Sequence, residues 1–215
     1  MTRNDFNSLI NLFNKSFPFD KNIKEIVTKA MIDIDRAIFV PDNLKDEAYF
    51  NNALPTYCGQ TISQPQIVFE MSCLLEPQKE SKILEIGTGV GYQTAILAYI
   101  SKEIISIERI EKLHQIAKNN LSKLNFNNVE LLLRNGSRGY ENRKPYDRIL
   151  ITASIKKDYI DIIKNQLNDN GILIAPLEIN FGLQQLIKIK KVNDKYFEEY
   201  HSYCVFVPII DKAPE

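Results

Sequence analysis

Hydrophobic positions in the first 80 residues recur at helical spacing, whereas those after residue 81 form short runs that alternate with helical patterns. Two amphipathic faces come first. They consist of Phe6, Leu9, Ile10, Phe13 and Phe17, and of Ile23, Ile26, Val27, Ala30 and Met31. Residues 36–65 are broken by Pro41, Pro55 and Pro65 and look loop-rich, and residues 66–75 are again helical in pattern. We expect both N-terminal faces to pack into a core.

Five apolar runs of strand length begin with "KILEIG", and helical patterns follow several of them. The runs cover residues 82–87, 103–108, 129–135, 146–153 and 171–177. Strands that alternate with helices predict a parallel, doubly wound sheet. The last two runs, residues 184–192 and 196–209, are separated only by a short turn and predict an antiparallel hairpin at the sheet edge. The prediction is an α/β fold with a mostly parallel seven-stranded sheet, an antiparallel C-terminal hairpin and a helical N-terminal extension.

Composition narrows the classes of function. The 215 residues suffice for one sizeable domain, and equal numbers of acidic and basic residues leave no global field toward nucleic acid or a membrane surface. The three cysteines are far apart and form no CxxC pair, which favours a reducing compartment without a zinc site. The N-terminus lacks the apolar stretch of a signal peptide, and no apolar run approaches a membrane span. We expect a cytoplasmic monomer that binds neither nucleic acid nor membrane.

The clearest motif is the glycine loop "LEIGTGVGYQTA" between the first strand and its helix. Gly87, Gly89 and Gly91 allow a tight turn and a close approach of the backbone to a ligand. Glu108 ends the second strand, where an acidic side chain can accept hydrogen bonds from both ribose hydroxyls of a nucleotide-like ligand. In an open α/β sheet the ligand binds at the carboxyl ends of the strands.

The acidic residue before the first glycine bears on which ligand this is. Glu85 would repel a pyrophosphate but could pair with the ammonium group of an amino acid. The GxGxG spacing also differs from the GxGxxG of dinucleotide sites. Both observations favour S-adenosylmethionine over NAD. After the third strand, Asn135 and Gly136 are compatible with an adenine contact or with a simple Asn-Gly turn, and the two can coexist.

Ser63 lies in the polar stretch "LPTYCGQTISQP", directly before the helical pattern of residues 66–75. Serine is a preferred helix N-cap, so Ser63 could serve only to cap that helix. The alternative is a role in chemistry.

Several segments together resemble the protein-L-isoaspartate O-methyltransferases, over about residues 36–208. The most specific is "GQTISQPQIV", and the others are "DRAIFVP", "AYFNNALP", "LEIGTGVGYQTAILA", "IER", "PYDRILITAS" and "CVFVPII". The resemblance implies methyl transfer from S-adenosylmethionine to the carboxyl group of L-isoaspartyl residues in damaged proteins. The resulting ester closes to a succinimide, which can reopen to a normal aspartyl residue.

The same resemblance implies roles for individual residues. Ser63 corresponds to the catalytic serine of the family. The implied substrate contacts are Gln60, Thr61, Ile62 and Val207, and the implied cofactor contacts are Glu85, Gly87, Thr88, Gly89, Gly91, Glu108, Asn135 and Gly136. No metal is implied. Within a single domain of residues 1–215, residues 1–80 form the extension that carries the acceptor loop, and residues 81–215 form the cofactor-binding methyltransferase core.

The residues present agree with a carboxylate acceptor. A carboxyl group with a pKa near 4 is already ionised at neutral pH and needs no general base. A hydroxyl such as that of Ser63 can orient it without acting as a nucleophile. Neither His114 nor His201 lies in a motif, and we expect both to be structural. The "ITAS" that follows the fourth strand offers no acidic acceptor for an amine proton, and carboxylates that would bind a metal are not clustered.

Two positions depart from the family pattern. Tyr57 replaces a glycine of the family and is expected to narrow the substrate channel or alter the loop, next to Cys58. Asn135 replaces an aspartate, which removes a charge near the expected adenine position. Two alternatives therefore remain: a paralogous methyltransferase with another small-molecule or protein substrate, and a non-catalytic cofactor-binding module.

Overall fold

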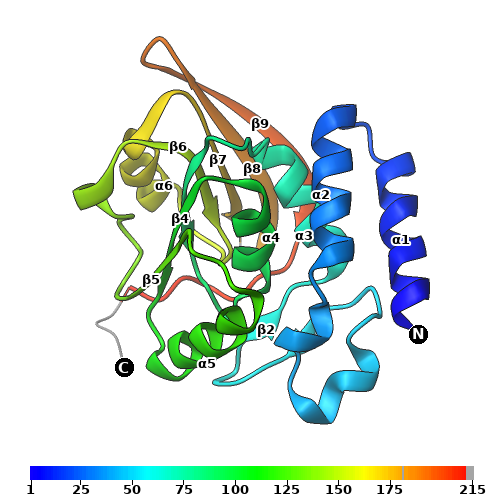
Figure 1. Cartoon of the computed structure of the whole chain (residues 1–215). Coiled ribbons are helices and arrows are strands. Elements are labelled where there is room, and N and C mark those ends of the chain that lie inside the picture. Colours follow the sequence, from blue (N-terminus) through cyan, green and yellow to red (C-terminus); the bar gives the residue numbers. More distant parts are fainter. Residues whose placement is uncertain (181, 212–215) are drawn as a thin grey trace.

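A computed structural model describes residues 1–180 and 182–211, which form a sheet covered by helices on both faces (Figure 1). The strand order is β5-β4-β3-β6-β7-β8-β9. The strands are β3 (Lys82–Ile86), β4 (Glu103–Glu108), β5 (Val129–Leu133), β6 (Tyr146–Ile151), β7 (Leu167–Asn180), β8 (Leu183–Val192) and β9 (Lys195–Cys204). The pairs from β5 to β7 are parallel, and those between β7, β8 and β9 are antiparallel. The predicted α/β class, the mostly parallel seven-stranded sheet and the edge hairpin are confirmed.

Six α-helices in the described residues surround this sheet. They are α1 (Arg3–Ser16), α2 (Lys21–Asp33), α3 (Pro65–Leu75), α4 (Tyr92–Ile100), α5 (Glu111–Leu121) and α6 (Lys157–Ile163). Short 3₁₀ turns lie at η1 (Arg36–Phe39), η2 (Asp42–Glu47), η3 (Ser122–Leu124), η4 (Glu141–Arg143) and η5 (Lys164–Gln166). A two-stranded ladder of β1 (Leu54–Pro55) and β2 (Thr61–Ile62) precedes α3. None of the described helices is long and apolar enough to cross a membrane.

The N-terminal helices begin at side-chain caps and bury one face each. Thr2 and Asp5 form a reciprocal capping box at α1, and Asp20 accepts from two backbone amides at α2. The prediction for Ile26 is wrong: its side chain is 43% exposed, because it lies at the outer margin of the α2 face. The inner residues of both helices share one hydrophobic cluster with α3, α4 and α5, so the extension packs directly on the sheet-covering helices.

The central strands are buried on both faces, which explains their nearly continuous apolar sequences. Alternate residues of one strand enter different clusters: Ile83 packs with α3 and α4, whereas Leu84 packs on the opposite face with Ile160 and Ile163 of α6. Successive side chains of a strand point to opposite faces, so one apolar run serves two layers.

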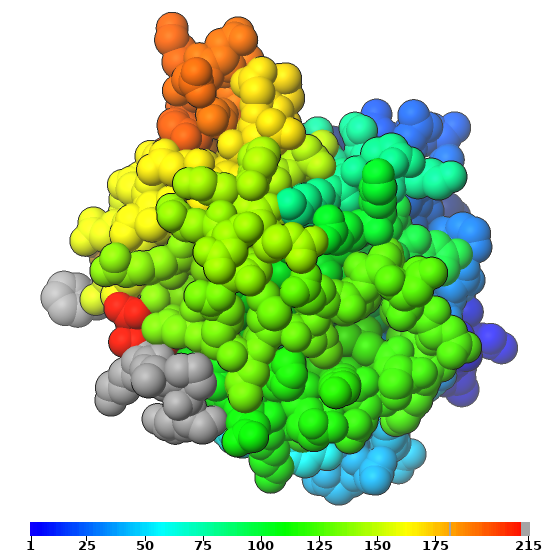
Figure 2. Space-filling model, turned by 60° about the vertical axis from the view of Figure 1, so that its left-hand side comes forward, coloured from blue at the N-terminus to red at the C-terminus, as the bar shows by residue number. Residues whose placement is uncertain are grey.

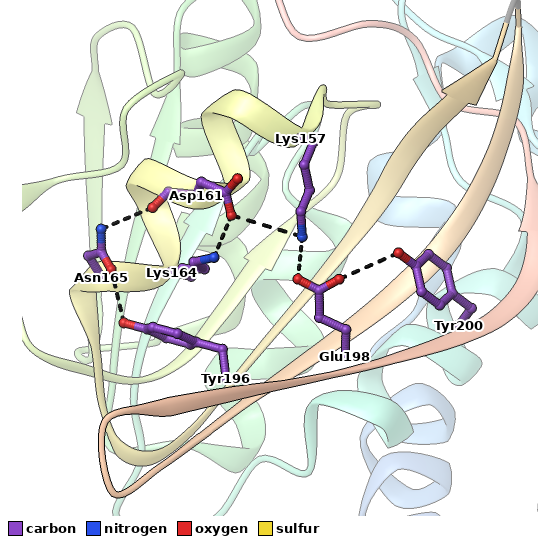
Figure 3. Close-up of polar contacts among 7 residues, drawn as sticks. All are labelled: Lys157, Asp161, Lys164, Asn165, Tyr196, Glu198 and Tyr200. Carbon is purple, nitrogen blue, oxygen red and sulfur yellow. Dashed lines mark hydrogen bonds and ion pairs between the residues drawn. The ribbon is translucent and has the colours of Figure 1, made fainter.

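The edge hairpin turns at Asn193 and Asp194, both with positive φ, as the tight turn between Val192 and Lys195 requires. Its tip projects from the body of the protein in Figure 2. Polar contacts fasten β9 to α6 and η5: an ion pair joins Glu198 to Lys157 of α6, and the Tyr196 hydroxyl donates to Asn165 of η5 at 3.0 Å (Figure 3).

The last predicted strand is shorter than expected. β9 ends at Cys204, whereas the apolar run suggested residue 209. Residues 205–211 leave the sheet edge and cross the carboxyl ends of the parallel strands toward β5, as the red segment of Figure 1 shows. The Val207 carbonyl accepts from the Ser154 amide, and the Ile209 amide donates to the Ser154 carbonyl, each at 2.8 Å. The final apolar residues are therefore used beside the strand ends rather than in the sheet.

Candidate active site

A cavity opens at the carboxyl ends of β3, β4, β5 and β6, with an empty volume of about 900 Å³ that includes its mouth. Six separate segments line it. They are residues 60–63 before α3, residues 87–90 of the glycine loop, residues 107–110 at the end of β4, residues 134–136 after β5, residues 152–153 after β6 and residues 207–210 of the C-terminal segment. The sheet topology thus brings together the acceptor loop and the cofactor loop that the sequence predicted.

The glycine loop is held in a conformation that only glycine adopts easily. Gly87 has a φ of 100°, and a Cβ there would collide with the hydroxyl of Thr152. Gly89 has a φ of 57°, and its amide donates to the Glu108 carboxylate at 2.8 Å. Gly91 is the N-cap of α4, with a φ of 95°, and its Cα faces Leu121. It does not line the cavity. Its predicted direct contact with the cofactor has no support in this placement.

Glu108 lies in the cavity wall with 6% of its surface exposed. Its carboxylate accepts backbone hydrogen bonds from Gly89, and from Arg109 and Ile110 at 2.9 Å each. Burial raises its pKa, while these three hydrogen bonds act in the opposite direction. A carboxylate has about four acceptor sites, so capacity remains for a ligand hydroxyl.

Glu85 is not where the sequence placed it. The side chain is fully buried beneath the glycine loop and does not line the cavity. Its Oε2 accepts from the hydroxyls of Thr94 and Ser106, both at 2.5 Å, and Oε1 has no partner among the described residues. Ser106 in turn contacts the Thr88 hydroxyl at 2.6 Å. Burial raises the pKa of Glu85 to about 7. The expected direct pairing with a ligand ammonium is corrected, because the strand directs this carboxyl into the core to support the loop.

Asn135 and Gly136 line the cavity, and the turn expected at this dipeptide is present. Asn135 Oδ1 accepts from the amide of Ser137 at 2.8 Å, which is the local turn. Its Nδ2 donates to the carboxylate of Asp211 at 3.1 Å. A Cβ at Gly136 would lie 2.7 Å from Ile86, so only glycine allows this close approach to the strand ends.

Ser63 lines the cavity and does not cap α3. The N-cap residue is Gln64, whose side chain makes no capping hydrogen bond, and Pro65 occupies the first turn. Asn51, from a distant loop, accepts from the Gln66 amide at 3.1 Å and takes over the capping role. The capping hypothesis for Ser63 is wrong because another side chain satisfies the helix end.

Arg36 is the residue of the site region that sequence reasoning missed. It is fully buried, and its guanidinium donates to the carbonyls of Ala48 at 2.5 Å and of Asn52 and Ser63 at 3.1 Å each. It also lies 6.0 Å from the ring of Tyr92, which lines the cavity. Burial lowers the pKa of Arg36 to about 10, so it stays charged at neutral pH. This arginine fixes the backbone on which the Ser63 hydroxyl is mounted. The only signal in the sequence was an arginine within the apolar stretch "DRAIFVP".

Of the two effects expected of Tyr57, a narrower channel or an altered loop, the structure contradicts the first, and neighbouring Cys58 does not narrow the cavity either. Neither residue lines it. Tyr57 packs against the N-terminal core with Lys112 lying 5.3 Å over its ring, and Cys58 is exposed with a φ of 57°. The base of this loop is closed by the ladder between Leu54–Pro55 and Thr61–Ile62. Among the described residues, no group of three or more His, Cys, Asp or Glu side chains is placed to hold a metal ion.

The comparison with known proteins decides the family. The family model described as protein-L-isoaspartate(D-aspartate) O-methyltransferase matches residues 11–214. The chain belongs to this family. A relative named protein-L-isoaspartate O-methyltransferase from Dictyoglomus thermophilum is 44% identical over 191 residues, covering 88% of this chain and 86% of the relative. Another of the same name, from Aliivibrio fischeri, is 41% identical and covers 86% and 88%.

Solved structures show the same fold in this methyltransferase family. A protein-L-isoaspartate O-methyltransferase superposes with a TM-score of 0.83 at 22% identity, covering 96% of this chain, which in turn spans 65% of that longer protein. A putative protein-L-isoaspartate O-methyltransferase from Plasmodium falciparum, solved with S-adenosyl-L-homocysteine, superposes with a TM-score of 0.80 at 22% identity, covering 96% and 99% of the two chains.

Proposed function

We propose that this protein transfers the methyl group of S-adenosylmethionine to the carboxyl group of L-isoaspartyl residues in damaged proteins and so begins their repair. The observation that carries the proposal is that Ser63 and the glycine loop of residues 87–90 line one cavity in a chain of this family. The relatives named for this activity share about two fifths of their residues with this chain over most of its length.

The residues at the strand ends fit an adenosine-bearing cofactor. Glu108 is fixed by three backbone amides and keeps acceptor capacity for ribose hydroxyls. Gly87 and Gly89 let the backbone approach the ligand, and Gly136 lets the loop after β5 pack closely against Ile86 at the strand ends. When bound, S-adenosylmethionine supplies an electrophilic methyl group.

On the acceptor side, the chain only has to position a carboxylate that is already ionised. The Ser63 hydroxyl donates a hydrogen bond to one carboxylate oxygen and leaves the other free to attack, so no general base takes part. Arg36 keeps the Ser63 backbone in place, and Ile62 and Val207 contribute apolar surface that excludes water. Backbone groups near Gln60, Thr61 and Val207 bind the extended peptide around the damaged residue.

The test is transfer of a labelled methyl group to an isoaspartyl peptide and to its aspartyl counterpart. We expect turnover of the first and none of the second. Ser63→Ala is expected to lower kcat roughly 10- to 100-fold, because a donor that orients the reacting group is lost, with unchanged affinity for S-adenosylhomocysteine. Ser8→Ala, on the exposed surface of α1, is the control. Equal rates on both peptides would refute the substrate assignment.

We also propose that the protein acts as a monomer in the cytoplasm. All three cysteines are free thiols, as a reducing compartment favours. Sedimentation of the purified protein tests the monomer, and fractionation of the source cells tests the location.

A further inference from the structure

The C-terminal segment of residues 205–211 forms one wall of the cavity through residues 207–210. Its start is fixed to the sheet edge: the Gln184 side chain accepts from the Phe206 amide at 2.6 Å and donates to the Phe206 carbonyl at 2.9 Å. Its middle is held by the two backbone hydrogen bonds to Ser154. What fixes its far end is the side chain of Asp211.

Asp211 joins three parts of the protein that are distant in sequence. Its Oδ1 accepts from Asn135 Nδ2 at 3.1 Å and from the Ser137 hydroxyl at 2.5 Å, and its Oδ2 accepts from the Tyr159 hydroxyl at 2.7 Å. These hydrogen bonds, with a smaller contribution from Arg138, lower the pKa of Asp211 to about 2. The carboxyl group of Asp211 is therefore ionised in the folded protein at neutral pH.

The anchors on the body of the protein are themselves fixed. Tyr159 lies on α6, which is tied to β9 by the Lys157–Glu198 ion pair, and Tyr196 of β9 also donates to Asn165 of the adjoining η5 (Figure 3). Asn135 is held by its own turn through the Ser137 amide.

We propose that Asp211 is a latch, whose carboxylate fastens the C-terminal segment onto the loop of residues 134–137 and thereby holds the cavity wall beside the adenosine end of the cofactor. The inference rests on the proposed function for the identity of that cofactor. It makes Asp211 a positioning residue, whose carboxylate reaches Asn135 from the C-terminal segment.

The first test compares Asp211→Ala with wild type in two measurements. Hydrogen exchange of residues 205–210 in the unliganded protein is expected to become faster, and S-adenosylhomocysteine is expected to bind about tenfold more weakly, as the loss of charge-assisted hydrogen bonds predicts. Asp158→Asn is the control, since that exposed carboxyl lies beside Tyr159 without contacting the latch. Unchanged exchange overturns the latch, and faster exchange with unchanged affinity overturns its link to the cofactor.

The second test exchanges the two partners. Asn135→Asp places a second carboxylate against Asp211 and should weaken S-adenosylhomocysteine binding, because like charges repel. Combining it with Asp211→Asn restores one carboxylate and one amide, so affinity should return to nearly that of wild type. A double variant as weak as the two single changes combined overturns the pairing. Neither test needs a methyl acceptor. A lack of isoaspartyl turnover would therefore refute the proposed function, whereas the role of Asp211 could still be tested.

Discussion

Replacing Arg36 by methionine tests whether a buried guanidinium positions the acceptor loop. The variant keeps an unbranched side chain of similar length but loses the hydrogen bonds to the carbonyls of Ala48, Asn52 and Ser63. Hydrogen bonds from a charged donor contribute about 1.5–3 kcal/mol each, so their gross loss is roughly 5–9 kcal/mol.

Part of that loss is offset because the variant no longer buries a charge. The pKa of Arg36 falls from 12.5 to about 10, which corresponds to a desolvation cost of about 3 kcal/mol. The net destabilisation is therefore roughly 2–6 kcal/mol. For a protein of this size, each kcal/mol lowers Tm by about 2–4 °C, so we expect a fall of at least about 4 °C by scanning calorimetry.

The functional part of the prediction is measured well below the Tm of the variant. The Ser63 carbonyl loses its anchor, so kcat for an isoaspartyl peptide should fall, while the affinity for S-adenosylhomocysteine should change little. Arg148→Met is the matched control: Arg148 is also buried and donates to two carbonyls, of Glu76 and Asp147, but lies at the opposite end of the sheet. It should lower Tm without affecting kcat. An Arg36→Met protein with wild-type peptide turnover would refute the positioning role.

Three further changes probe other parts of the site. Glu85→Gln should flatten the pH dependence of the free energy of unfolding. The pKa of this carboxyl rises from 4.5 to about 7 on folding, so its stabilising contribution is complete below pH 4.5 and is lost as pH rises through 7. An equal fall in the free energy of unfolding between pH 5 and 7.5 in variant and wild type would contradict this. Gly87→Ala should abolish S-adenosylhomocysteine binding by calorimetry, whereas Gly182→Ala, also at positive φ but in open space, should not. Asn51→Ala should lower the free energy of unfolding in urea by about 1 kcal/mol, and Ser63→Ala should hardly change it, because Asn51 caps α3. A larger loss for Ser63→Ala than for Asn51→Ala would restore Ser63 as the cap.

The fold was predictable because its determinants are local. Apolar runs of strand length and helical spacing placed β3, β4, β5 and β6, and the Asn193–Asp194 turn closed the edge hairpin as its short length required. The end of β9 was not predictable in this way. Residues 205–209 are as apolar as a strand, but Val207, Pro208 and Ile209 line the cavity while Val205 is exposed, and nothing local distinguishes this segment from a strand.

Part of the candidate site was likewise predictable from the sequence, and part was not. Glycines at positive φ and an acidic residue at a strand end leave a pattern in the sequence, and the structure places Gly87, Gly89 and Glu108 in the cavity wall. Glu85 was assigned the wrong environment, because its position in β3 alone does not say whether the carboxyl faces a ligand or the core. Burial decides this, and the hydroxyls that accompany Glu85 come from α4 and β4.

Residues that act through another residue's backbone leave the weakest trace in the sequence. Arg36 holds the carbonyl of Ser63 from 27 positions away, and Asn51 caps the helix that follows Ser63. The capping hypothesis for Ser63 was reasonable from its position alone, and it failed because a side chain from another loop had already satisfied the helix end. With neither the cap nor a structural hydrogen bond claiming it in the described structure, the Ser63 hydroxyl is left available to the cavity, which is the physical condition that a carboxylate-orienting donor needs.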